Sequence, residues 1–203
     1  MEKAAISLRP VREEDAGQIA AIYRPYVEKT AITFEYDAPE PSEFIRRIRS
    51  VTQKYPWICA VDTADQILGY MYSGAFHARP AYDWSVETSI YLSEGARGRH
   101  IGTLLDTAYC RLLSKAGFTN VNACITVSPR AKDEYVTDAS PKFHAHQGYT
   151  LCGHFHNCGY KFGQWYDMIW MEKIIARHES RPVHPRVLPD TDIRQILIQE
   201  HAR

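Results

Sequence analysis

A short loop rich in glycine and arginine is the part of the sequence best suited to bind an anion. Residues 94–102 read EGARGRHIG, and apolar residues at helical spacing follow them. Backbone N–H groups at a helix start bind anions, glycines let a ligand approach closely, and Arg97 and Arg99 add positive charge. The loop matches neither the dinucleotide fingerprint nor Walker A, which disfavours nucleoside triphosphate hydrolysis. A pyrophosphate is the natural ligand, and the alternative is a glycine-tolerant loop with solvated arginines.

A carboxylate lies on the segment directly before this loop. Residues 84–92 alternate strictly between two faces, which predicts a strand with Glu87 between Ser85 and Ser89 on one face. A strand carboxylate is most often simply exposed to solvent. Beside an anion-binding loop, Glu87 is also a candidate general base.

Histidines and cysteines in the last third of the chain alternate as metal ligands on a strand do. The runs are His144-x-His146 and Cys152-x-His154-x-His156-x-Cys158. Alternate residues on a strand share a face, so the second run is able in principle to hold zinc. Its spacing matches no common zinc module, and we therefore predict no metal.

Composition excludes several classes of protein. The 203 residues contain 24 Lys plus Arg and 24 Asp plus Glu, so the formal net charge is zero. Nucleic-acid binding or adhesion to an acidic membrane usually needs a basic excess. No apolar run approaches the ~20 residues that span a bilayer, the N-terminus does not resemble an export signal, and the five cysteines are scattered. These features predict a cytoplasmic enzyme with reduced thiols and no nucleic-acid or membrane partner.

The elements that must position this chemistry can be read from periodicity. Helical spacing is expected after Asp15, in a helix that Pro25 bends or ends early, and again after Pro41. The remaining segments are strands at 6–10, 57–61, 67–73, 84–92, 121–127, 149–153 and 165–174, helices at 101–116 and 141–146, and a terminal helix at 193–198. This order predicts one α/β or α+β domain over residues 1–176 with a mixed sheet. Residues 177–203 read as a C-terminal tail that docks on a partner subunit.

The loop resembles the pyrophosphate loop of the GNAT superfamily of N-acetyltransferases, Gln/Arg-x-x-Gly-x-Gly/Ala. Arg97 takes the first position, His100 the middle glycine and Gly102 the last. Further segments resemble the phosphinothricin acetyltransferase family within it: residues 31–35, 55–57, 68–70, 79–87 and 159–168. The resemblance covers about residues 5–175. It implies a single-domain GNAT fold with a mixed, mostly antiparallel, splayed sheet flanked by helices, acetyl-CoA as donor, no metal, and a homodimer.

The resemblance also implies which residues hold acetyl-CoA. The backbone of Ile90, Tyr91 and Leu92 would pair with the pantetheine arm, with the Leu92 amide polarising the thioester carbonyl. The pyrophosphate would be held by Arg97, Gly98, Arg99, His100, Ile101, Gly102 and Thr103. His100 must then adopt the left-handed conformation, which a histidine tolerates.

The chain departs from the family after the strand at 121–127. Relatives read Pro-Asn-x-x-Ser there, whereas this chain carries an insertion at about residues 130–139. Thr137 takes the place of the asparagine if Ser140 matches the serine. Both become expected cofactor contacts, and the insertion is expected to reshape the acceptor pocket.

The family pattern assigns the remaining roles. Glu87 matches the catalytic glutamate that deprotonates the amine. His144 takes the place of a tyrosine that protonates the departing thiolate, and the alternatives are acceptor binding or a helix histidine packed under the sheet. Arg79 is the expected clamp for a carboxylate, with Phe34 and Tyr82 as pocket walls, against the alternative of a surface arginine and two packed aromatics.

The sequence therefore predicts an enzyme that acetylates the amine of a small amino acid or analogue similar to phosphinothricin, methionine sulfone or methionine sulfoximine. One alternative is a GNAT enzyme for another amine, such as a peptide N-terminus or a polyamine. A polyamine site would need an acidic pocket, and Arg79 argues against it. Another alternative is a non-catalytic acyl-CoA sensor, which would lack a working base, and Glu87 argues against that.

Overall fold

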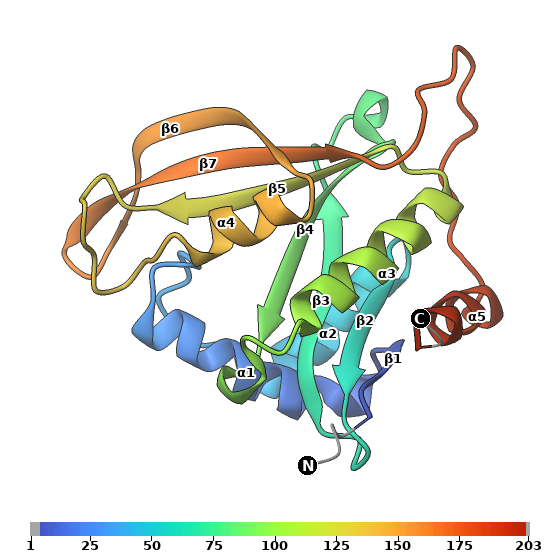
Figure 1. The fold of residues 1–203 in the computed structure, drawn as a ribbon, viewed down its shortest axis with the longest axis horizontal. Coiled ribbons are helices and arrows are strands. Elements are labelled where there is room, and N and C mark those ends of the chain that lie inside the picture. The colour runs from blue at the N-terminus through green and yellow to red at the C-terminus, as the bar shows by residue number, and fades with distance from the viewer. Residues whose placement is uncertain (1–4, 202–203) are drawn as a thin grey trace.

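A mixed sheet of seven strands forms the centre of the molecule (Figure 1). A computed structural model describes the backbone of residues 5–201 and the side chains of residues 5–198. The strands lie in the order β1 (Ser7–Pro10), β2 (Trp57–Val61), β3 (Ile67–Ala75), β4 (Ser85–Leu92), β5 (Asn120–Val127), β7 (Gln164–Ile174) and β6 (Thr150–Lys161). Every neighbouring pair is antiparallel except β4 and β5. The expected mixed, mostly antiparallel sheet is confirmed.

Helices cover both faces of the sheet. They are α1 (Ala16–Lys29), α2 (Pro41–Thr52), α3 (Ile101–Ala116), α4 (Ala139–His146) and α5 (Asp190–His201). One apolar cluster joins α1 and α2 to β2 and β3 through residues such as Ile19, Phe44 and Tyr70. A second, larger cluster joins α3 and α5 to the opposite face through residues such as Leu105 and Leu197. No helix within residues 5–201 is long and apolar enough to cross a membrane.

Helix α1 continues past a proline that was expected to disturb it. It continues through Pro25 to Lys29, so of the two expected effects of this proline, a bend or an early end, the early end is wrong. A proline inside a helix removes one hydrogen bond, here to the carbonyl of Ala21, which lies on the exposed side of the helix. Tyr26 and Val27 are buried directly after the proline, and their packing keeps the last turn in place.

The C-terminal third differs most from the expected elements. Strand β6 runs to Lys161, although the sequence predicted a strand only over 149–153, and it forms a long hairpin with β7. After residue 177 the chain returns to the sheet as α5, whose Ile193 and Leu197 are buried beside β1 and α3 of the same chain. Docking of this segment on a partner subunit stays a prediction.

Candidate functional site

Strands β4 and β5 separate in the middle of the sheet and leave a gap between them. They pair only from Ser85 to Glu87 on β4, opposite residues 120–122 of β5. At the fork, Asn122 Nδ2 donates to the carbonyl of Val86 at 3.1 Å, and Thr88 Oγ1 donates to the carbonyl of Asn122 at 3.3 Å. Beyond it, β4 continues beside β3 and β5 beside β7. The expected splayed sheet is confirmed.

The edge of β4 that faces the gap offers backbone groups to an extended ligand. The N–H of Ser93 donates to the carbonyl of Leu68 on β3 at 2.9 Å. Because successive residues of a strand turn their N–H groups to opposite sides, those of Ile90 and Leu92 face the gap. An arm with amide groups, like a further strand, can pair with this edge.

Tyr26 of α1 occupies part of this edge, and sequence analysis missed it. Its hydroxyl accepts a hydrogen bond from the N–H of Leu92 at 3.2 Å and donates to the carbonyl of Leu92 at 2.7 Å. Its ring lies against Tyr91 and under the guanidinium of Arg97, 5.4 Å from the ring centre. A ligand that uses the Leu92 amide must therefore take the place of the Tyr26 hydroxyl. Its helical spacing identified Tyr26 only as a core residue.

The loop before α3 has the backbone shape of an anion site. Gly98 and His100 have φ angles of 73° and 62°, so His100 adopts the left-handed conformation that its place in the motif requires. The N–H of Leu104 is bonded to the carbonyl of His100 at 3.1 Å. The first three N–H groups of α3 therefore have no acceptor within the helix; they belong to Ile101, Gly102 and Thr103.

The side chains of this loop leave the anion site accessible. Arg97, Arg99 and His100 are exposed. Gly102 has a different role, because a Cβ atom there would lie 3.0 Å from the ring of Phe143. The glycine thus allows α4 to approach the start of α3.

Helix α4 carries His144 as a buried side chain. His144 is 6% exposed, and its Nδ1 donates to the carbonyl of Ser140 at 2.9 Å, which leaves Nε2 without a hydrogen in the neutral ring. Burial lowers the pKa of His144. The charged groups that act on the pKa of His144 are Asp106 and Lys173, whereas the one that acts on the pKa of Glu87 is His77. The two expected catalytic residues therefore have different charged neighbours.

The inserted segment before α4 is an ordered loop. Asp133 accepts hydrogen bonds from Ser128 Oγ at 2.9 Å and from the backbone N–H groups of Tyr135 at 2.8 Å and Val136 at 3.2 Å. Thr137 is exposed, and its hydroxyl accepts only a long bond of 3.4 Å from Ala139 N–H. The loop lines an open pocket of about 530 Å³ beside the end of β5, to which Thr137 also contributes.

Glu87 has the surroundings of a general base. It stands opposite Gly74 of β3 and is half-buried, and burial raises the pKa of its carboxyl group while nearby His77 opposes the shift. Among the described residues it has no hydrogen-bond or ion-pair partner. A half-buried, unpartnered carboxylate with a raised pKa is suited to accept a proton near neutral pH.

A polar group around Tyr72 extends the site on the Glu87 face, and the sequence did not reveal it. Tyr72 stands opposite Ser89, and burial raises the pKa of its hydroxyl, on which the charges of Arg47, Glu35 and Glu87 also act. Arg47 Nη2 binds Glu35 Oε1 at 2.8 Å, while Glu35 Oε2 is buried without a partner. Glu35 lies in one of the family-like segments, but Arg47 reads as an ordinary helix-surface residue.

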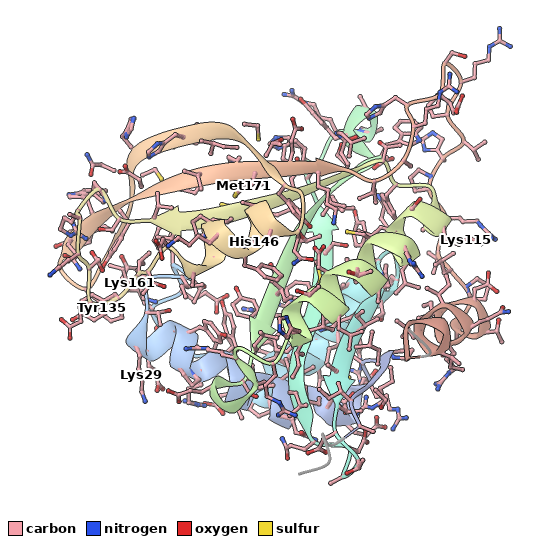
Figure 2. The ribbon with its side chains drawn as sticks, in the orientation of Figure 1. Lys29, Lys115, Tyr135, His146, Lys161 and Met171 are labelled. Atoms are coloured by element: carbon pink, nitrogen blue, oxygen red, sulfur yellow. The ribbon has the colours of Figure 1, made fainter. Side chains whose placement is uncertain are left out.

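Lys161 holds the loop that carries Phe34 and Glu35. It is 2% exposed, and its Nζ donates to the carbonyls of Val27, Thr30 and Thr33 at 2.8, 2.9 and 2.8 Å. Figure 2 shows Lys161 between the β6–β7 hairpin and the end of α1. This side chain had no role in sequence analysis, although it lies in a family-like segment.

Phe34 itself is fixed by a glycine. A Cβ atom at Gly159 would lie 2.2 Å from the Phe34 ring, so only glycine leaves room for it. Tyr36 Oη also donates to the carbonyl of Tyr160 at 2.6 Å. The β6–β7 hairpin therefore positions this wall of the expected pocket.

Arg79 and Tyr82 lie on a short segment at the end of β3. Both are exposed, and Tyr82 packs on His77 and Phe76, with ring centres 4.8 and 6.0 Å away. The Arg79 side chain has no hydrogen-bond partner among the described residues. His77 connects this segment with Glu87, because its charge acts on that carboxylate.

Comparisons with known proteins agree with this geometry. Residues 8–170 match the family described as the acetyltransferase (GNAT) domain. A phosphinothricin N-acetyltransferase of Streptomyces coelicolor is 33% identical over 84% of this chain and 96% of its own. An L-methionine sulfoximine/L-methionine sulfone acetyltransferase of Pseudomonas aeruginosa is 28% identical over 87% of this chain and 98% of its own.

A solved structure supports the same family. A GNAT superfamily phosphinothricin acetyltransferase from Sinorhizobium meliloti, in complex with acetyl-CoA, is 31% identical and covers 92% of this chain and 97% of its own, with a TM-score of 0.80. The resemblance, the enzyme class and acetyl-CoA as donor, all expected from the residues, are confirmed. This chain belongs to the phosphinothricin acetyltransferase-like group of the GNAT family and is an acetyl-CoA-dependent N-acetyltransferase.

Proposed function

We propose that this enzyme acetylates the amine of a small amino acid or analogue that carries a second polar group, of the phosphinothricin, methionine sulfone or methionine sulfoximine kind. The observation that carries the proposal is Glu87, a half-buried carboxylate that no side chain within residues 5–198 binds, beside the gap between β4 and β5. The names of the relatives point to the same acceptors.

The cofactor half of the site fits acetyl-CoA. The edge of β4 at Ile90 and Leu92 suits the amide-bearing arm, with Tyr91 between them, once the Tyr26 hydroxyl leaves the backbone of Leu92. The loop from Arg97 to Thr103 suits the diphosphate, because the N–H groups of Ile101, Gly102 and Thr103 have no acceptor within α3 and two arginines precede them. Ser140 and Thr137 are proposed as further contacts from the start of α4. Bound acetyl-CoA supplies an activated acetyl thioester.

Glu87 and the backbone perform the proton and charge steps in this proposal. Glu87 accepts a proton from the acceptor's ammonium group, directly or through water, and so frees the nitrogen lone pair. The Leu92 amide, once released by Tyr26, donates to the oxygen on which negative charge develops.

In this proposal His144 has a packing role in α4 and takes no part in the proton transfer. Its Nδ1 hydrogen is held by Ser140, and burial disfavours its cation, so the geometry favours the packing alternative over the acid. The departing thiolate then takes its proton from water. We expect His144→Ala to lower thermal stability more than turnover at saturating substrates.

The acceptor half of the site combines a base with cations. Arg79 is proposed to bind the acceptor's carboxylate, with Phe34 and Tyr82 as walls. Arg47 adds a guanidinium on the Glu87 face, where it is bound by the carboxylates of Glu35 and Glu43. This mixture of charges suits a zwitterion better than a polyamine.

A thiol-release assay with acetyl-CoA tests the proposal. The acceptor panel is phosphinothricin, methionine sulfone, methionine sulfoximine, a peptide N-terminus and spermidine. We expect the highest kcat/KM among the three amino-acid analogues. Preference for the peptide or spermidine would replace the acceptor class, and acetyl-CoA binding without thiol release would favour the sensor.

We also propose a cytoplasmic homodimer. All five cysteines are free thiols, as is usual in a reducing compartment. Leu151, Phe155 and Trp165 of the outer hairpin are more than half exposed, and a second copy is a suitable cover for them. Light scattering would give the mass in solution.

A further inference from the structure

Strand β6 carries two histidines that converge on one buried carboxylate. His154 Nε2 lies 2.9 Å and His156 Nδ1 3.2 Å from Oδ2 of Asp167, which is on β7. The ligand atoms of the three side chains lie within 4.8 Å of one another. The alternation of residues 152–158 indicated a cluster of two histidines and two cysteines. In the structure the third member of the cluster is Asp167 of the neighbouring strand, and Cys152 and Cys158 are not part of it.

The carboxylate is held in a fixed orientation. Asp167 is 6% exposed on its side chain, and its other oxygen, Oδ1, accepts a hydrogen bond from the N–H of Asn157 at 2.8 Å. Asn157 has a φ of 48° and lies in a register shift between β6 and β7. The backbone N–H of Asn157 thus binds Oδ1 and leaves Oδ2 directed at the histidines. Hydrogen bonds of this kind commonly orient the carboxylates that bind metal ions in proteins.

The histidines leave the other side of the cluster open. Their side chains are 41% and 72% exposed, and the ring centres are 4.2 Å apart. Each histidine now points a ring N–H at Asp167. In the other neutral tautomer the hydrogen lies on the second ring nitrogen, and the nitrogen that faces Asp167 has a lone pair that can bind a metal ion. An ion about 2.0–2.1 Å from each ligand in a tetrahedron needs ligand atoms about 3.3 Å apart, so small side-chain shifts suffice.

We propose that His154, His156 and Asp167 bind one divalent transition-metal ion of the zinc class. Imidazole and carboxylate suit zinc, and the exposed side leaves room for water as a further ligand. The ion would join β6 to β7 at the register shift and stabilise the hairpin that holds Phe34. Acetyl transfer as described above does not require it.

Equilibrium dialysis against zinc chloride, with bound metal measured by mass spectrometry, tests this site. The full chain is first freed of metal with a chelator. We expect one zinc ion per chain, a melting temperature that rises with zinc, and affinity at least ten-fold weaker in His154→Gln, His156→Gln and Asp167→Asn. His156→Gln is decisive if a buried change disturbs folding, because the His156 side chain is largely exposed.

Matched controls come from the same region. Cys152→Ser and Cys158→Ser, on the same strand, and His146→Gln, an exposed histidine of α4, should bind zinc as the parent does. Bound cobalt should show no thiolate charge-transfer absorption. Absence of stoichiometric zinc in the parent protein would overturn the site, as would loss of binding in a cysteine variant or an equal loss in His146→Gln.

Discussion

The two halves of the site are built from different materials. On the cofactor side, the binding groups are backbone N–H groups of β4 and of the first turn of α3, set by two positive φ angles. On the acceptor side, they are side chains from β3, β4, α2 and the loop after α1, held by a lysine from the far end of the sheet. A backbone site tolerates many side chains, whereas a side-chain site depends on each residue and on what positions it.

The largest difference between the halves is expected at Glu87. Glu87→Gln removes the base but keeps its size, so we expect turnover to fall about 10²–10⁴-fold while acetyl-CoA affinity changes little. Because burial raises the pKa of Glu87, activity of the parent enzyme should fall on acidification above the usual carboxyl range, as the carboxylate becomes protonated. Stopped assays across pH, with Glu94→Gln as an exposed control, measure both. Unchanged turnover would remove Glu87 from the chemistry.

Replacing Lys161 tests whether the acceptor half depends on the hydrogen bonds that this lysine makes to the loop after α1. Lys161→Met keeps the aliphatic chain but leaves three carbonyls without their donor, and we expect a loss of roughly 3 kcal/mol in the free energy of unfolding. The loop with Phe34 should loosen, raising KM for the acceptor about ten-fold with little change in acetyl-CoA affinity. Denaturant unfolding and steady-state kinetics check this.

The exposed Lys115, at the end of α3, provides the matched control (Figure 2). Lys115→Met should change neither KM nor stability. If Lys161→Met weakened acetyl-CoA binding as much as acceptor binding, the two halves would not be independent.

The sequence predicted the elements that form the cofactor half, because their cues are local. Strict alternation identified the β4 strand, and the glycine-arginine loop identified the start of α3, including a histidine where a left-handed residue is needed. Both patterns lie within about twenty consecutive residues. A backbone site can therefore be recognised without knowing the fold.

Tyr26, Arg47 and Lys161 were not predicted because their contacts are distant in sequence. Tyr26 meets Leu92, and Lys161 meets Thr33, only after the sheet has formed. The far part of β6 was missed because the alternation of residues 152–158 was interpreted only as a possible ligand pattern, and a register shift at 155–159 interrupts the pairing with β7. Asp167 gave no sign of joining the histidines, since its partner strand was not predicted to extend that far.

His100 allows the cofactor half to be tested by backbone shape alone. A β-branched residue resists the left-handed conformation by about 1–2 kcal/mol, so His100→Val should weaken acetyl-CoA binding about ten-fold. His100→Gly restores the usual glycine of the motif and should bind at least as well as the parent. Calorimetric titration compares the three. Weak binding by the glycine variant instead would mean that the imidazole itself contacts the ligand.

Arg79 is expected to have a smaller effect, restricted to the acceptor. Arg79→Ala should raise KM several-fold for acceptors with a free carboxylate, because an exposed arginine–carboxylate contact contributes only about 1 kcal/mol. The carboxamide derivatives of the same acceptors should be much less affected. Equal effects on acids and amides would show that Arg79 does not bind the carboxylate.

Tyr26 lies where the two halves meet and should have the smallest effect. Tyr26→Phe removes the hydroxyl that binds both backbone groups of Leu92 but keeps the ring against Tyr91 and Arg97. We expect about 1 kcal/mol less stability, acetyl-CoA affinity within three-fold of the parent, and unchanged or higher kcat, because the Leu92 amide becomes free. A hundred-fold loss of kcat at normal affinity would instead place the Tyr26 hydroxyl among the reacting groups and join the two halves through one side chain.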